Sequence, residues 1–246
     1  VLKQTDKLGF NPAFAPLMPL WETKQMAVVL GVGYPNPNLS HFRGINIWNS
    51  GSDAETFIDS GWISRLLRES KPGRDFAADG INLGHNSLGP LGGDRTKVVT
   101  LIRKPEKFLK LASRIQPGNA RMANPALAHI VKQRRDLRGA ADNIVAKQIE
   151  NVNVSGAFFD TKLGAQFETA ARLLIAGVKA PVLKLTIGKF DTHAGQEPLH
   201  AELLSDIATN VAAFAKLMKA KGLWDNVTVM SYSEFGRRPF ENNSSG

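Results

Sequence analysis

Short apolar runs alternate with amphipathic stretches along most of the chain. Runs that are rich in β-branched residues and bounded by Gly or Pro predict buried strands at about 26–33, 97–102, 181–188 and 226–232. Apolar residues three or four positions apart predict a helix over 199–221, and a similar stripe predicts another helix before residue 181. This alternation is typical of an α/β fold with a mostly parallel central sheet and helices on both of its faces.

The remaining stretches have weaker patterns. They predict a short helix that begins near Pro12, amphipathic helices around 42–48 and 58–67, and a helix-like stretch over 126–150. Residues 73–93 hold six of the 22 glycines, which predicts an irregular segment. No glycine pattern of a dinucleotide or phosphate-binding loop is complete, and this argues against a nucleotide site of either type.

Length and charge narrow the possibilities further. The 246 residues, 43% of them hydrophobic, suit one large domain, and no apolar run is long enough to predict a membrane span. The absence of cysteine excludes disulfides and a Cys nucleophile. Most of the net charge of +9 lies in residues 95–138, which hold twelve Lys or Arg against two acids. The segment contains no recognisable nucleic-acid-binding motif, so we expect no specific nucleic-acid partner. We expect residues 103–138 to form a solvated basic excursion that attracts anions.

An acid and an imidazole lie in a turn directly after the predicted strand 181–188. Asp191 and His193 can face one point, and a carboxylate with a neutral imidazole suits Zn, Mn or Fe. The spacing is equally compatible with a structural turn in which Asp191 is a cap and His193 bonds a backbone carbonyl. His200 falls in the opening of the next helix and is predicted to be a surface residue.

Ser40 and His41 open the predicted helix at 42–48, where backbone N–H groups and the helix dipole favour an anion. The Ser40 hydroxyl can be a nucleophile or a helix cap, and capping is the commoner role of a serine there. His41 can act as a base or an anion contact, or it can be a surface residue bonded to solvent.

A third polar cluster, residues 233–238, follows the predicted strand 226–232. Its arginines suit recognition of a phosphate or sulfate ester, with Arg237 as the candidate substrate contact, whereas an internal salt bridge to Glu234 is the alternative. If the last two strands are parallel neighbours joined by a right-handed crossover, Asp191 and Glu234 lie at the same carboxyl edge of the sheet.

Three stretches together resemble the family catalogued as domain of unknown function 1501. They are residues 34–51 with Ser40-His41-Phe42, 188–196 with Asp191-Thr192-His193, and 233–238 with Ser-Glu-Phe-Gly-Arg-Arg. The resemblance covers nearly the whole chain in the same order and spacing. It implies a distant relationship to sulfatases and alkaline phosphatases, and so a three-layer α/β/α sandwich with an alkaline-phosphatase-like fold. Many members carry a twin-arginine export signal, which implies a periplasmic or exported location.

The same resemblance implies chemistry. It puts Asp191, His193 and Glu234 at the ligand positions of a divalent metal (Zn, Mn or Ca) and Ser40 at the nucleophile position. We therefore expect a metal-dependent hydrolase that acts on a small anionic phosphate or sulfate ester. The alternative hypothesis is a non-catalytic exported or surface protein that keeps the hydrolase-like fold and holds a polyanion.

Two departures from the family pattern affect the expected metal site. The family usually begins with a strand that carries Gly-Gly and an Asp, and it usually continues past Gly246 with Thr-Asp-His-Gly. We therefore expect residues 1–246 to form a single alkaline-phosphatase-like domain that lacks its N-terminal strand and C-terminal part. The metal site is then incomplete, and the metal can be absent. The sequence does not specify an oligomeric state.

Overall fold

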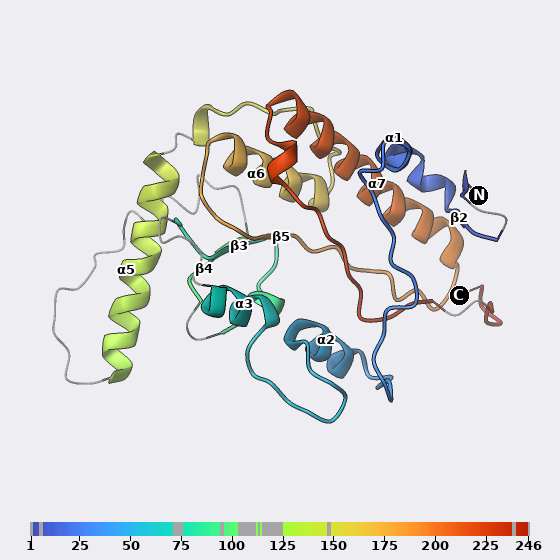
Figure 1. Cartoon of the computed structure of the whole chain (residues 1–246), viewed down its shortest axis with the longest axis horizontal. Helices are drawn as coiled ribbons and strands as arrows, with labels where there is room; N and C mark the ends of the chain where they lie inside the picture. Colours follow the sequence, from blue (N-terminus) through green and yellow to red (C-terminus); the bar gives the residue numbers. More distant parts are fainter. Residues whose placement is uncertain are drawn as a thin grey trace.

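The computed structural model describes residues 2–4, 7–70, 76–93, 96–102, 112, 114, 125–146, 149–237 and 240–245. Figure 1 shows helices α6 and α7 on one side of a small sheet and helices α2 and α3 on the other. These four helices are α2 (His41–Ser50), α3 (Trp62–Ser70), α6 (Lys162–Ile175) and α7 (Gln196–Ala220). The other helical elements are η1 (Pro12–Leu17), α1 (Met18–Glu22), η2 (Gly89–Leu91), α5 (Pro125–Ala146), η3 (Ile149–Asn151) and η4 (Trp224–Asn226).

The central sheet has three parallel strands in the order β4-β3-β5. They are β3 (Gly80–Leu83), β4 (Val98–Leu101) and β5 (Leu183–Lys184), and all four residues of the middle strand β3 are buried. A separate antiparallel pair joins β1 (Leu2–Lys3) to β2 (Gly9–Phe10). The structure therefore confirms a mixed α/β protein with a parallel sheet, and β4 falls inside the predicted strand 97–102.

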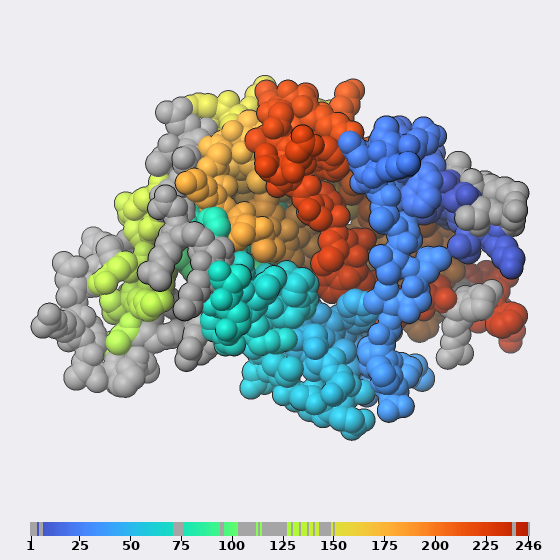
Figure 2. All heavy atoms as spheres, viewed as in Figure 1, coloured from blue at the N-terminus to red at the C-terminus, as the bar shows by residue number. Residues whose placement is uncertain are grey.

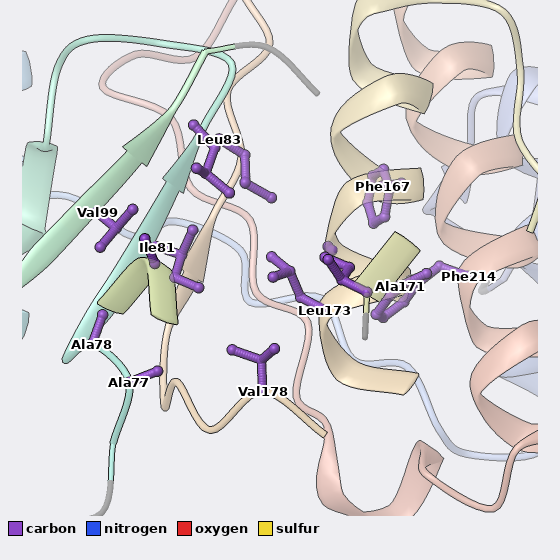
Figure 3. Close-up of a cluster of buried hydrophobic side chains, with 14 of the residues drawn as sticks. Ala77, Ala78, Ile81, Leu83, Val99, Phe167, Ala171, Leu173, Val178 and Phe214 are labelled. Carbon is purple, nitrogen blue, oxygen red and sulfur yellow. The ribbon is translucent and has the colours of Figure 1, made fainter. Parts of the chain in front are cut away.

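Side chains of the sheet, α6 and α7 form the main hydrophobic core (Figure 3). Ile81, Leu83 and Val99 contribute from the sheet, and none of them is more than 2% exposed. On the helical side, Phe167 of α6 packs against Phe214 of α7 with ring centroids 5.5 Å apart. Burial of each such side chain stabilises the fold by about 1.5–3 kcal/mol, so this core holds the two helices against the sheet.

Polar contacts fix the start of α6 against α7. Thr161 caps α6, because its Oγ1 accepts the N–H of Gly164 at 3.0 Å and donates to Asp206 of α7 at 2.7 Å. The buried amide of Asn210 accepts the N–H of Phe159 at 3.1 Å. A Cβ atom on Gly164 would overlap the carbonyl oxygen of Phe159, so this close approach requires glycine.

The prediction of a strand at 26–33 is wrong. Val29 and Leu30 are exposed, and Gly31 adopts a left-handed conformation with φ of +68°, which is not that of a strand. Figure 2 shows this part of the chain as a strip on the molecular surface. A strand needs a neighbour for its N–H and C=O groups, and an apolar run does not specify that neighbour.

The prediction of a strand at 226–232 is also wrong. After η4 the chain has no regular secondary structure, and its side chains contact α2. The Tyr232 ring stacks on Trp48 with centroids 6.0 Å apart, and its hydroxyl donates to Oδ1 of Asn49 at 3.0 Å. Packing against a helix has therefore replaced the expected ladder of backbone hydrogen bonds.

Two further strand boundaries differ from the predictions. The predicted strand 181–188 is paired only at Leu183–Lys184, and the chain then runs without regular structure toward residue 190. The prediction that 73–93 is irregular is wrong at Gly80–Leu83, which form the middle strand of the sheet. Gly80 at the first position of this four-residue strand and Gly84 directly after it obscure its pattern, and its place between two other strands decides its structure.

Most of the predicted basic excursion 103–138 lies outside the described residues, so α5 is its main described part. Figure 1 shows α5 at the β4 end of the molecule. Arg134 and Arg135 of α5 are exposed, and Lys132 pairs with Asp136 one turn later at 2.9 Å. No helix in the described part of the chain has the length and apolar character needed to cross a membrane.

Candidate functional site

Ser40 and His41 lie at the N-terminus of α2. Ser40 is the N-cap residue, with an extended backbone, and its N–H donates to Oδ1 of Asn38 at 2.9 Å. The residue is exposed, and its hydroxyl makes no capping hydrogen bond. The side-chain capping role considered from the sequence is therefore not used, although Ser40 does begin the helix.

The imidazole of His41 lies between two carboxylates from distant parts of the chain. Its Nδ1 is 3.4 Å from Oε1 of Glu234, and its Nε2 is 3.5 Å from Oδ2 of Asp191. The ring of Phe235 meets the imidazole edge-on, with centroids 4.9 Å apart. Asp191 and Glu234 thus meet at one side chain, although neither directly follows a regular strand as predicted.

Asp191 and His193 face each other across their turn. Nε2 of His193 lies 3.1 Å from Oδ2 of Asp191, and this hydrogen bond holds the pKa of Asp191 below its usual value. Burial opposes this by raising the pKa of Asp191, and the positive charges of His193, His41 and Arg237 lower it further. The His193 side chain is 84% exposed, so its ring is accessible from solvent.

The guanidinium of Arg237 lies against the same turn. Its Nη2 donates to the carbonyl oxygen of Thr192 at 2.6 Å, and its Nη1 lies 3.7 Å from Oδ1 of Asp191. The acid that Arg237 approaches is thus Asp191, while Glu234 faces His41. Arg238, the second arginine of this cluster, lies outside the described residues.

His200 is a site residue that the sequence reasoning missed. It was predicted to lie at the surface, but it is half-buried, and its Nε2 lies 3.0 Å from both the carbonyl oxygen of Phe190 and Oγ1 of Thr192. The Thr192 hydroxyl also contacts Oε1 of Gln196, one turn earlier in α7. Residues 196 and 200 share one face of the helix, and that spacing is the signal that could have indicated a contact with the preceding turn.

The site carries donor atoms of the kind that divalent metals use, namely two carboxylates and two imidazoles. Among the residues that the structure describes, no group of three or more His, Cys, Asp or Glu side chains is arranged to hold a metal ion. Asp191 and Glu234 face opposite nitrogens of His41, so the imidazole stands between the two carboxylates. The closest donor pair that could share an ion is formed by Asp191 and His193.

A cavity of about 510 Å³ opens at the start of α7, beside the turn that carries Asp191 and His193. Its described lining includes two carboxylates, one imidazole and an aromatic ring, from Glu197, Glu241, His200 and Phe240. The cavity offers space next to the turn for part of a bound molecule.

Comparison with known proteins bears on the family of the chain. Searches of curated proteins and of solved structures gave no match. One family model, described as Protein of unknown function (DUF1501), matches residues 12–246. This range covers nearly the whole chain and includes every site residue described above. The chain therefore belongs to the DUF1501 family.

Proposed function

We propose that this protein is a metal-dependent hydrolase of small phosphate or sulfate esters. The observation that carries the proposal is the position of His41. Its ring lies between Asp191 and Glu234, and Ser40 directly precedes it in the sequence. A serine hydroxyl at an exposed helix N-terminus, next to an imidazole held by carboxylates, provides a nucleophile, a proton acceptor and an anion-binding end of a helix.

The proposal includes the fold family and the location. We propose that residues 1–246 form a single domain related to the α/β/α sandwiches of sulfatases and alkaline phosphatases, with residues 103–138 as an outer basic excursion. Helices on both sides of a parallel sheet support this relationship (Figure 1). The periplasmic or exported location rests on the family resemblance alone.

A divalent metal would be held by Asp191, His193 and Glu234. The donor types fit, and the 3.1 Å between Oδ2 of Asp191 and Nε2 of His193 is near the spacing of two ligands that each lie about 2.0–2.2 Å from one ion. Glu234 instead faces Nδ1 of His41, so it would join the same ion only after the His41 ring has moved from between the two carboxylates. The imidazole favours zinc or manganese over calcium, which prefers oxygen ligands. When bound, such a metal supplies positive charge for the ester oxygens and lowers the pKa of an attacking hydroxyl or water.

The chain's own residues would perform the remaining steps. The Ser40 oxygen would form a bond to the phosphorus or sulfur atom while the bond to the alcohol oxygen of the ester breaks. His41 would accept the serine proton at Nε2, the nitrogen that lies 3.5 Å from Asp191, and pass it to the departing alcohol oxygen. A water molecule would then hydrolyse the serine ester and free Ser40. Glu234 at Nδ1 stabilises the charged imidazole ring. The N–H groups at the start of α2, and the donors of Arg237 that Thr192 does not use, stabilise the ester oxygens.

The test combines metal content with turnover in the purified chain. We expect a stoichiometric transition metal, and hydrolysis of an aryl phosphate or aryl sulfate that stops on chelation and returns when zinc or manganese is added. Asp191→Asn and Ser40→Ala should each abolish most of this turnover, whereas Asp225→Asn, an exposed acid outside the site, should leave it unchanged. A folded protein with neither bound metal nor turnover would refute the proposal.

A second candidate function is favoured by one observation, the exposure of Arg134 and Arg135 on α5. A non-catalytic exported or surface protein could use this helix to hold a polyanion. Binding of polyphosphate that Arg134→Ala with Arg135→Ala removes, in a protein without turnover, would favour this second function over hydrolysis.

A further inference from the structure

We infer that His200 is a positioning residue that, with Arg237, fixes the turn carrying Asp191 and His193 in one conformation. The inference deepens the proposed function and rests on it for the role of the two ligands. Its observations are the hydrogen bonds that α7, Arg237 and the C-terminal segment (residues 240–245) make to this turn and to the backbone on either side of it.

The contacts of His200 determine which ring nitrogen carries its proton. A carbonyl oxygen only accepts hydrogen bonds, so Nε2 of His200, 3.0 Å from the oxygen of Phe190, must be the protonated nitrogen. The same N–H lies 3.0 Å from Oγ1 of Thr192, whose hydroxyl is then oriented to donate to Oε1 of Gln196 at 3.3 Å. The Phe190 ring also meets the His200 ring edge-on at 5.4 Å. One imidazole thus holds both the backbone before Asp191 and the side chain after it.

Thr192 is the buried pivot of the turn. It is 8% exposed, whereas Asp191 and His193 on either side of it are exposed. Its side chain is held by His200, and its carbonyl oxygen accepts from Nη2 of Arg237 at 2.6 Å. The pivot is therefore held from two segments that are far apart in the sequence.

The C-terminal segment holds the far end of the turn. Nδ2 of Asn242 donates to the carbonyl oxygen of His193 at 3.0 Å. The N–H groups of Gly195 and Gln196 donate to the carbonyl oxygens of Ser244 and Ser245 at 3.1 and 2.7 Å. Figure 1 shows the C-terminus beside the start of α7, as these bonds require. The backbone on both sides of the two ligands is thus restrained.

These contacts leave the side chains of Asp191 and His193 accessible while their backbone is held. Groups that orient ligands in this way typically change metal affinity by about 10–100-fold when they are removed. Without His200, only Arg237 and the C-terminal segment would restrain the backbone of this turn. Loss of His200 should therefore weaken metal binding by Asp191 and His193 without removing either ligand.

The first experiment needs no metal. In the chelated protein, at a pH where the His200 ring is neutral, two-bond ¹H–¹⁵N NMR should show the tautomer protonated at Nε2. His200→Leu should shift the amide signals of residues 191–193. His200→Gln, which keeps a donor near the Nε2 position, should largely restore them. His85→Leu changes a ring that accepts from Ser87 in its own loop, so it should leave these signals unchanged. A ring protonated at Nδ1, or amide signals that His200→Leu does not move, would overturn the inference.

The second experiment measures zinc affinity by calorimetry in the same variants. We expect His200→Leu to weaken binding by about 10–100-fold, His200→Gln to restore most of it, and His85→Leu to have no effect. Wild-type zinc affinity in a folded His200→Leu variant would overturn the positioning role. If this variant does not fold, the NMR and calorimetry measurements are made on Arg237→Lys, which keeps the positive charge and loses the planar guanidinium group. If the wild type binds no zinc, the proposed function fails, and the NMR result alone decides whether His200 fixes the turn.

Discussion

Nδ1 of His41 lies 3.4 Å from Oε1 of Glu234, although 193 positions separate the two residues in the sequence. The contact belongs to a longer interface between α2 and the segment that follows η4. Within this interface, the Cα of Gly44 faces Glu234, and Tyr232 bonds Asn49. The position of the Glu234 carboxylate at the candidate site thus depends on α2, the same helix that presents Ser40 and His41.

Replacement of His41 should impair hydrolysis more than binding. If His41 accepts the serine proton, His41→Ala should lower kcat for an aryl ester by about 10²–10⁴-fold. KM should change little, because the ester oxygens are bound by other groups. His85→Ala is the matched histidine control. Steady-state kinetics test this, and an unchanged kcat in a folded His41→Ala protein would remove the residue from the reaction.

The carboxyl group of Asp191 should titrate below the usual value of 3.8 in the metal-free protein. Its hydrogen bond with His193 is the largest cause of the lowered pKa, so His193→Ala should raise the midpoint toward 3.8, and Arg237→Ala should raise it less. Because the folded-state pKa lies below the unfolded one, the stabilisation is present above the unfolded pKa and is lost as the pH falls through the folded pKa. ¹³C NMR of the carboxyl carbon measures the midpoint. A value at or above 3.8 in the wild type would contradict the contact with His193.

Two glycines in helices should respond in opposite ways to alanine. Gly164→Ala places a methyl group against the Phe159 carbonyl and should destabilise the protein by about 1–3 kcal/mol. Gly139→Ala in α5 meets no heavy atom within 4 Å and should stabilise it by up to about 1 kcal/mol through helix propensity. Urea unfolding compares the two. Equal stability of both variants would argue against the close approach of α6 to residue 159.

Lys184 should contribute to stability through its polar partners. Its Nζ lies 3.0 Å from both the carbonyl oxygen of Ser87 and Oγ1 of Thr186, and 3.4 Å from Oδ1 of the fully buried Asn82. Burial lowers the pKa of Lys184. Lys184→Met would leave these acceptors without the ammonium and should cost about 1–3 kcal/mol in urea unfolding. Lys216→Met, at an exposed position of α7, is the control, and equal stability of the two variants would show that the ammonium contributes nothing.

The sequence by itself determined the main helices and named the candidate side chains of the site. The stripes near 42–48, 58–67 and 199–221 predicted α2, α3 and α7, because the 3.6-residue period of a buried helix face is a local property. The predictions of the family and of the mixed α/β class, both made from the sequence, are also confirmed. The candidate residues Asp191, His193 and Glu234 could be named because carboxylates and imidazoles are recognisable wherever they occur.

Only the tertiary structure decided which extended segments became strands and which side chains met. The runs at 26–33 and 226–232 have strand-like composition but no ladder, while Gly80–Leu83, in a glycine-rich stretch, is the centre of the sheet. The contacts of His41 and His200 likewise join residues whose proximity no local pattern encodes. Composition and periodicity act over a few residues, whereas a strand, or a residue held between two distant segments, exists only when its partners fold beside it.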